Sequence, residues 1–116
     1  MATYRKKALN DKIIKEFISE ISAKFRAHVK RIILFGSRAK NNYKIYSDYD
    51  LLIVLDKKSS DIINKIYDIV VDFLINYGVD ISLKIYSEED YNQKFSLGTP
   101  FMKEIKRYGE VLWTQK

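Results

Sequence analysis

The segment that most constrains the fold is residues 50–55, which begins with Asp50 and continues as Leu-Leu-Ile-Val-Leu. After the aspartate, neither face of this segment carries a polar residue. A strand that is apolar on both faces has to be covered on both sides, as in the middle of a sheet that lies between helices. Residues 50–55 therefore predict the central strand of a layered α/β domain.

Helical and extended patterns alternate along the rest of the chain. Apolar residues recur at helical spacing over 10–27, and again from a Ser59 cap to a stop at Gly78. Strict alternation over 79–86 predicts a strand with one polar face. The remaining expected segments are a strand at 31–35, a helical turn from 36, a loop at 41–47, helices opening near 88 and 100, and a small strand at 110–113. The expected fold class is α/β (α+β), with one domain over 1–116 and a short mixed β-sheet flanked by helices.

The composition excludes several kinds of site. The 116 residues include no cysteine, which rules out disulfides and thiolate metal sites, and His28 is the single histidine. A multi-histidine metal site within one chain is thereby excluded, as is a Ser-His-Asp triad unless His28 is its base. No apolar run approaches the ~20 residues of a membrane span, and the charged N-terminus has no signal-peptide pattern. We expect a soluble, cytoplasmic protein with no membrane contact.

The net charge of +6 favours acidic partners, namely nucleotides, nucleic acid or an acidic protein. A compositional bias toward lysine and isoleucine explains the same charge equally well. The basic residues are scattered and form no long arginine stripe. Direct binding of nucleic acid is therefore not expected.

Two acids at the start of the central strand form the strongest candidate site. Residues at i and i+2 of a strand point to one face, so Asp48 and Asp50 aim at the same region. Asp80 heads the polar face of the later strand and would join them if the two strands pair, although it could also be a turn residue after Gly78. Three carboxylates suit Mg²⁺ or Mn²⁺, and two such ions can hold the attacking and leaving oxygens of a phosphoryl displacement.

The Gly36-Ser37 turn, separated from Asp48 by ten residues, supplies a second element of such a site. Gly36 permits close approach of the backbone to a phosphate, and Ser37 and Arg38 are candidates to hold a triphosphate. Tyr43 and Tyr46 lie in the following loop and could stack on a base. Other acids have simpler explanations: Asp56 suits a turn, and Asp68 and Asp72 suit an exposed helix face.

Gly36-Ser37, ten residues, Asp48-Tyr49-Asp50 and a following apolar strand resemble the signature of the DNA polymerase β-like nucleotidyltransferase superfamily. More narrowly, the chain resembles the minimal nucleotidyltransferase (MNT) antitoxins that pair with HEPN ribonuclease toxins, from the 31–35 strand to Trp113. The resemblance implies a nucleotidyltransferase fold in which Asp48 and Asp50 bind metal. It also implies that Asp80 joins them or helps deprotonate the acceptor, and that Ser37 contacts the nucleotide phosphates. The family often has a glycine where Lys40-Asn41 stands here.

The function that this resemblance implies is transfer of AMP from ATP to a tyrosine hydroxyl of a cognate HEPN toxin, which neutralises the toxin. Only 36 residues follow Asp80, too few for the helical acceptor domain of antibiotic nucleotidyltransferases, so a partner protein would bring the acceptor. One alternative is a non-catalytic module that sequesters a toxin or RNA. A second alternative, a small-molecule nucleotidyltransferase, is disfavoured by the length.

Overall fold

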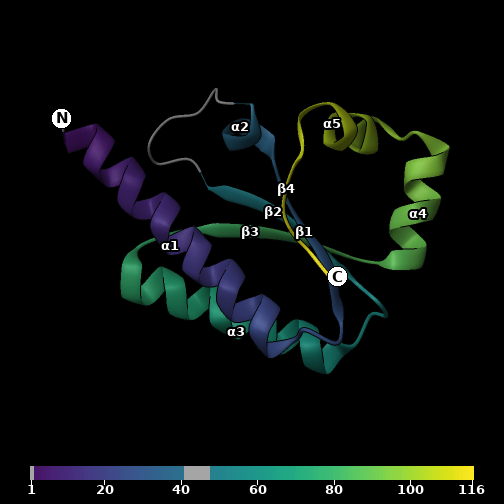
Figure 1. Cartoon of the computed structure of the whole chain (residues 1–116), viewed down its shortest axis with the longest axis horizontal. Helices are drawn as coiled ribbons and strands as arrows, with labels where there is room; N and C mark the ends of the chain where they lie inside the picture. The colour runs from purple at the N-terminus through teal and green to yellow at the C-terminus, as the bar shows by residue number, and fades with distance from the viewer. Residues whose placement is uncertain (1, 41–47) are drawn as a thin grey trace.

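The computed structural model describes residues 2–40 and 48–116, with side chains from residue 11 onward. In these two ranges, five helices and four strands follow one another in the order α1 (Ala2–Lys24), β1 (Val29–Phe35), α2 (Gly36–Ala39), β2 (Tyr49–Leu55), α3 (Ser60–Tyr77), β3 (Ile81–Ser87), α4 (Glu88–Leu97), α5 (Pro100–Tyr108) and β4 (Glu110–Thr114). Figure 1 shows them arranged around a single twisted sheet. No helix in the described part of the chain is long and apolar enough to cross a membrane.

The sheet is mixed, with strand order β3-β2-β1-β4. β1 pairs antiparallel with β2 and with β4, whereas β2 and β3 are parallel. A parallel pair needs a crossover, and α3 supplies it. β2 thus lies inside the sheet, as its apolar sequence predicts, and β3 and β4 form the two edges.

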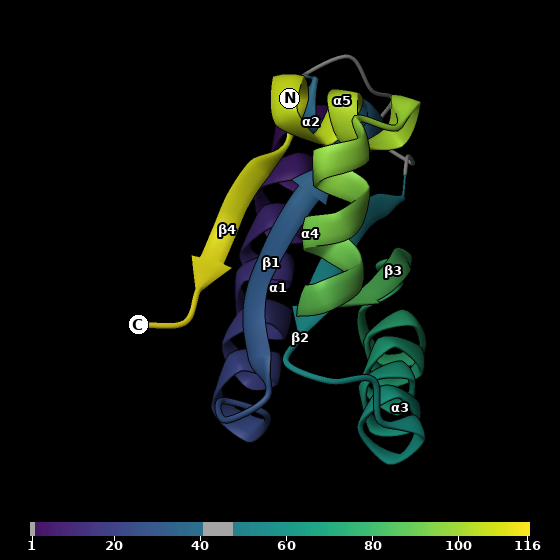
Figure 2. The same ribbon diagram turned by 90° about the vertical axis from the view of Figure 1, so that its right-hand side faces the viewer.

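Two layers of helices cover the two faces of the sheet. Every side chain from Leu51 to Leu55 is fully buried, which confirms that β2 is covered on both sides. The larger part of the core lies on the face covered by α1 and α3, where the rings of Phe17 and Phe73 meet edge to face at 5.3 Å. The smaller part lies under α4 and α5 and includes Leu52, Val54, Tyr91, Met102 and Ile105. Figure 2 shows α1 and α4 on opposite sides of the sheet.

The predicted caps are confirmed. The side chains of Ser59, Ser87 and Thr99 each accept a hydrogen bond from the backbone amide three residues on, which satisfies a free amide of the first turn. Gly78 ends α3 with φ of 67°, a conformation that glycine adopts at no steric cost. The crossover helix therefore has defined ends, which fixes where β3 begins.

Several boundaries differ from the sequence prediction, including the start of β1, which is Val29 rather than residue 31. Helix α1 begins at Ala2 and ends at Lys24, because the amides of His28 and Val29 bond to the carbonyl of Phe25 in a turn that closes the helix. β3 begins at Ile81 rather than at residue 79. The expected loop at 41–47 lies outside the described residues.

Candidate active site

The parallel pairing of β2 with β3 brings two of the three predicted acids together. Tyr49 lies opposite Ile81, and the Tyr49 amide donates to the Asp80 carbonyl at 3.0 Å. Asp48 immediately precedes β2, so its side chain emerges beside Asp80, within hydrogen-bonding reach of the Asp80 carboxyl. The α3 crossover therefore places Asp80 beside Asp48, immediately before β3 begins.

The carboxyls of Asp48 and Asp50 are destabilised as anions. Partial burial raises the pKa of Asp48, and the charge of Asp80 raises it further, while Arg38 acts in the opposite direction. Burial also raises the pKa of Asp50, and the negative charges of Asp48 and Glu104 add to that effect. The three predicted acids form a chain of mutual repulsion in which Asp48 interacts with both others. A cation among them would remove this repulsion.

Gly36 contacts this site in a way that the sequence did not reveal. Its φ is +73°, and a β-carbon added to it would lie 2.3 Å from Oδ2 of Asp50. From the sequence, Gly36 is expected to permit close approach of the backbone to a phosphate. Within the protein, its close approach is to the Asp50 carboxylate. Because Phe35 pairs with Asp50 across β1 and β2, the register itself sets this contact.

The Arg38 side chain lies on the other face of β2. It is 6% exposed, and its guanidinium lies over the Tyr49 ring, 3.9 Å from the centroid. The Tyr49 hydroxyl donates to Oδ1 of Asp11 on α1 at 2.5 Å. Tyr49 stands between the two β2 acids, so alternation along the strand points its ring toward α1. The alternation along the strand could have predicted the direction of the Tyr49 ring from the sequence. No pattern in the sequence indicated Asp11 as its hydrogen-bond partner.

Arg38 would therefore need to leave its stacked position to touch a triphosphate directly, and its contact with nucleotide stays a prediction. As placed, it acts on the site through its charge, which lowers the pKa of Asp48 against the effects of burial and of Asp80. Ser37 precedes it in α2 and is partly exposed. Lys40 ends α2 in right-handed helical geometry and forms an ion pair with Glu104 of α5. Tyr43 and Tyr46, the candidate base-stacking residues, lie outside the described residues.

The donor set fits a hard divalent cation in its chemistry, since it consists of carboxylate oxygens alone. Within the described ranges, no three His, Cys, Asp or Glu side chains converge tightly enough to enclose an ion as they stand. Asp48 approaches Asp80 on one side and Asp50 on the other. Small rotations of these side chains would therefore be needed to hold Mg²⁺ or Mn²⁺.

A separate cleft of about 670 Å³ lies on the α1 side of the sheet, between α1 and β4. Arg38 and Tyr49 line one end of it, and Trp113 lines the other. None of the three candidate acids borders this cleft. Arg38 and Tyr49 therefore separate it from the carboxylates on the opposite face of β2.

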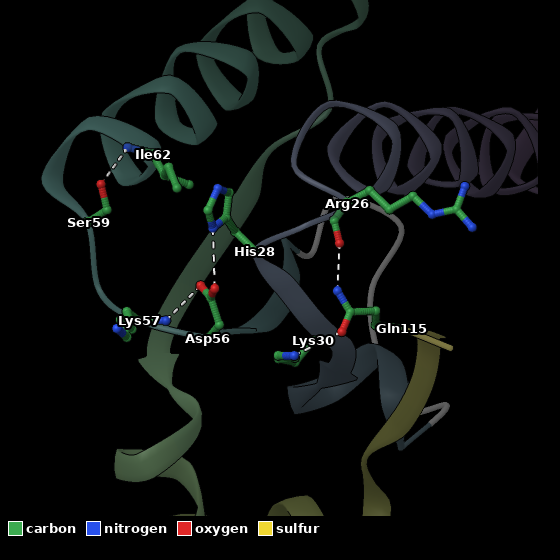
Figure 3. A network of polar contacts seen from close by, with 8 residues as sticks. All are labelled: Arg26, His28, Lys30, Asp56, Lys57, Ser59, Ile62 and Gln115. Carbon is green, nitrogen blue, oxygen red and sulfur yellow. Dashed lines mark hydrogen bonds and ion pairs between the residues drawn. The ribbon is translucent and has the colours of Figure 1, made fainter.

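His28 lies at the far end of the sheet from the acids. Its Nδ1 is 3.3 Å from Oδ2 of Asp56, and the Asp56 Oδ1 accepts the Lys57 amide at 2.7 Å (Figure 3). His28 follows α1 by four residues, so it lies beyond the last turn of the helix and pairs with Asp56. Asp56 is a turn residue, as expected.

The family is decided by a profile described as "Nucleotidyltransferase domain", which matches residues 14–105, a range that contains Gly36 and all three acids. The chain belongs to this nucleotidyltransferase family. A Methanocaldococcus jannaschii protein named "Putative protein adenylyltransferase MJ0604" is 38% identical over 103 residues, covering 89% of this chain and 97% of that protein. The expected enzyme class is thus confirmed at the level of the family.

Solved structures of low sequence identity have the same fold. A crystal structure described as a "putative nucleotidyltransferase" from Sulfolobus solfataricus superposes with a TM-score of 0.64 at 20% identity, covering 99% of this chain and 89% of that chain. A structure described as "the toxin-antitoxin with AMP-PNP" gives a TM-score of 0.57 at 14% identity, covering 88% of this chain and 74% of that one. The predicted fold class, a short mixed sheet flanked by helices in a nucleotidyltransferase fold, is confirmed.

Proposed function

We propose that this nucleotidyltransferase is an antitoxin that transfers AMP from ATP to a tyrosine hydroxyl of a cognate HEPN ribonuclease toxin. The observation that carries the proposal is the placement of Asp48 at the start of β2 between Asp80 and Asp50, where the pKa of Asp48 and of Asp50 is raised by burial and by neighbouring carboxylates. A site that gathers unfavourable negative charge around an open strand end is suited to a cationic metal–nucleotide complex.

Each acid has a distinct part in this proposal. Asp48 and Asp50 would hold Mg²⁺ or Mn²⁺, which neutralises charge on the phosphates of ATP when bound. Gly36 and Ser37 would border the triphosphate, with Arg38 assisting through its charge. Asp80 lies beside Asp48 and would orient the acceptor hydroxyl and take its proton. The tyrosine oxygen then bonds to the α-phosphorus, the bond between the α-phosphorus and the bridging oxygen breaks, and pyrophosphate leaves with that oxygen.

The names of similar proteins support the choice of substrate and partner. The M. jannaschii relative is named a protein adenylyltransferase, which agrees with AMP transfer to a protein. Two superposable structures are described as toxin–antitoxin complexes, one of them with the ATP analogue AMP-PNP. A tyrosine acceptor is chemically favourable because its hydroxyl, with a pKa of about 10, loses its proton more readily than that of serine. An added AMP would repel the phosphates of RNA near a toxin's cleft.

The test uses the purified protein encoded by the adjacent gene as acceptor, if it is a helical protein with an Arg-x₄-His ribonuclease motif. This acceptor is incubated with the nucleotidyltransferase, ATP and MgCl₂, and its intact mass is measured. We expect a gain of one or more AMP masses located on a tyrosine. Asp48→Asn should abolish the gain, and Asp80→Ala should slow it by about 10²–10⁴-fold while leaving ATP binding measurable.

The second candidate is a non-catalytic module that neutralises the toxin by binding alone. Asp48→Asn separates the two functions, because it removes a charge of the site while keeping nearly the same side-chain size and shape. If the toxin stays unmodified and wild type and Asp48→Asn inhibit its ribonuclease activity equally, the binding module is correct and the adenylyltransferase proposal is refuted.

A further inference from the structure

Helix α3 carries an exposed apolar stripe in addition to its buried face. Nine large apolar side chains in the described part of the chain are exposed, and five of them lie on this helix. They are Tyr67, Val71, Leu74, Ile75 and Tyr77, with exposed fractions of 44%, 49%, 45%, 74% and 51%. The first four follow the i, i+4, i+7, i+8 spacing of a single helical face, so they form one continuous surface. We call these five residues the α3 stripe.

Within the described ranges, the Tyr77 ring packs 5.2 Å from that of Phe73, whereas the other four side chains of the stripe lie outside the buried core. The residues of α3 that face the sheet are different ones, Ile66, Ile69, Val70 and Phe73, and they are buried. An amphipathic helix needs only this buried face to hold its place, whereas the α3 stripe leaves apolar area in water at a cost. Contiguous exposed patches of this kind mark interaction sites on soluble proteins.

The charges beside the stripe indicate the chemistry of its occupant. Asp61, Asp68 and Asp72 follow one edge of the stripe at spacings of seven and four residues, in a protein whose net charge is +6. Of the two lysines nearby, Lys65 pairs with Asp61 at 3.1 Å and Lys24 pairs with Glu20 at 3.1 Å. No ion pair to Asp68 or Asp72 forms within the described ranges, so this edge presents uncompensated negative charge.

The stripe also ends beside the candidate active site. Tyr77 is three residues before Asp80, and the chain between Ile75 and Asp80 spans at most ~18 Å. Figure 1 shows the C-terminal end of α3 leading into β3 at the end of the sheet where β2 begins, and Figure 2 shows α3 below β3. A protein that rests on the stripe would therefore lie within reach of the carboxylates.

We propose that the α3 stripe is the surface on which the protein acceptor docks, and that the acceptor presents to it an amphipathic helix whose apolar face is bordered by lysine or arginine. This inference rests on the proposed function, because it concerns the same acceptor. Complementary charge selects a basic partner over a second copy of this chain, since two copies packed through α3 would bring like acidic edges together. A basic surface is also what a ribonuclease needs in order to hold RNA.

The test compares two equally exposed aliphatic residues. Ile75→Glu alters the stripe, and Leu97→Glu alters α4, with 74% and 73% exposure in the wild type. The probe is the purified acceptor protein defined above, and calorimetry measures its dissociation constant. We expect Ile75→Glu to weaken binding by about 30-fold, as for a central interface residue, and Leu97→Glu to change it less than twofold. Val71→Ser serves as a milder variant should Ile75→Glu melt early.

A separate variant tests whether the acidic edge of the stripe attracts the acceptor. Replacing Asp68 and Asp72 together with lysine should weaken binding by about 10-fold at low salt and flatten its dependence on NaCl, because a screened attraction has been removed. Equal affinities of Ile75→Glu and Leu97→Glu would overturn the docking surface. So would sedimentation of the free wild-type protein as a dimer that Ile75→Glu dissociates, since the occupant would then be a second copy.

Failure of this inference is distinguishable from failure of the proposed function. Asp48→Asn leaves the stripe intact, so it should bind the acceptor as wild type does while transferring no AMP. An acceptor that binds through the stripe but gains no mass refutes the transfer and leaves the docking surface standing. An acceptor that gains AMP equally well from wild type and Ile75→Glu refutes the docking surface alone.

Discussion

Replacing Gly36 with alanine should distinguish two reasons for a glycine at this position. One is its positive φ, and the other is the close approach of the backbone to the Asp50 carboxylate. At φ of +73° an alanine costs about 1–2 kcal/mol relative to a relaxed residue, and a stiffer unfolded chain returns about 0.4–1 kcal/mol of this. The net loss of stability should be about 1 kcal/mol, which lowers the melting temperature by roughly 4 °C. Gly98 at φ of +63° should lose the same amount, because its added β-carbon meets only Lys103 Cε at 3.7 Å.

The two variants differ in what the new methyl group meets. At Gly36 it would lie 2.3 Å from Oδ2, 3.1 Å from Cγ and 3.3 Å from Cβ of Asp50. Ordinary contact begins near 3.4 Å, so the carboxylate has to move by about 1 Å, and rotation about its last bond cannot relieve the contact with Cγ. Misplacement of a reacting group by 1 Å costs about 10²-fold in rate. Gly36→Ala should therefore transfer AMP about 100-fold more slowly than Gly98→Ala, at equal stability.

The assays are thermal unfolding and AMP transfer measured side by side, with calorimetry of ATP in the presence of MgCl₂ as a readout that needs no partner. A further control places Gly36→Ala in an Asp50→Ala background, where the clash with the carboxylate is gone. There, as in the wild-type background, its cost in stability should equal that of Gly98→Ala, because the positive φ alone sets it. Nucleotide affinity and transfer by Gly36→Ala equal to those of Gly98→Ala would refute the assignment of this glycine to the Asp50 contact.

Two other substitutions test the site from its two faces. Burial and the charges of Asp48 and Glu104 raise the pKa of Asp50 above 3.8. Its ionisation therefore destabilises the fold progressively as the pH rises from about 3.8 through the raised pKa of the folded state. Without metal, Asp50→Asn should then raise the melting temperature at pH 7 by a few degrees. This gain should vanish near pH 3.5, and adding MgCl₂ should not raise the melting temperature of the variant further. A variant that melts below wild type at pH 7 would contradict this expectation. On the opposite face, Tyr49→Phe removes the hydrogen bond to Asp11 and should cost about 1 kcal/mol in urea unfolding, whereas an unchanged midpoint would mean that the bond contributes nothing.

The layered fold was predictable from the sequence because its signals were local and agreed with one another. The aliphatic run of β2, the alternation before Tyr86 and the caps at Ser59, Ser87 and Thr99 each depend on neighbouring residues only. The sequence did not predict the parallel pairing of β2 with β3. That pairing was only the condition under which Asp80 would join the site. The register that meets this condition, Tyr49 opposite Ile81, comes from the tertiary structure.

The parts of the site that sequence reasoning missed involve residues far apart in the chain. The stacking of Arg38 on Tyr49 and the bond from Tyr49 to Asp11, 38 residues away, depend on how α1 crosses the sheet. A triphosphate-binding role for Arg38 follows naturally from its place after Gly36-Ser37, and only the packing reveals that its side chain is turned toward α1. The contact between Gly36 and Asp50 was hidden for the same reason, since it depends on the pairing of β1 with β2.

The α3 crossover has a consequence for when the protein becomes competent during its synthesis. Asp80 is 32 residues after Asp48 and reaches it only once the whole crossover helix has been made and β3 has paired beside β2. The sheet itself is finished later still, because β4 at the end of the chain pairs with β1 near its start. Such distant pairings are slow to close, since the entropy of a long loop is lost before any contact repays it. A chain still emerging from the ribosome thus has its first two acids but no third one beside them, and it acquires the complete set of carboxylates only after Ile81–Ser87 has been made and has paired as β3.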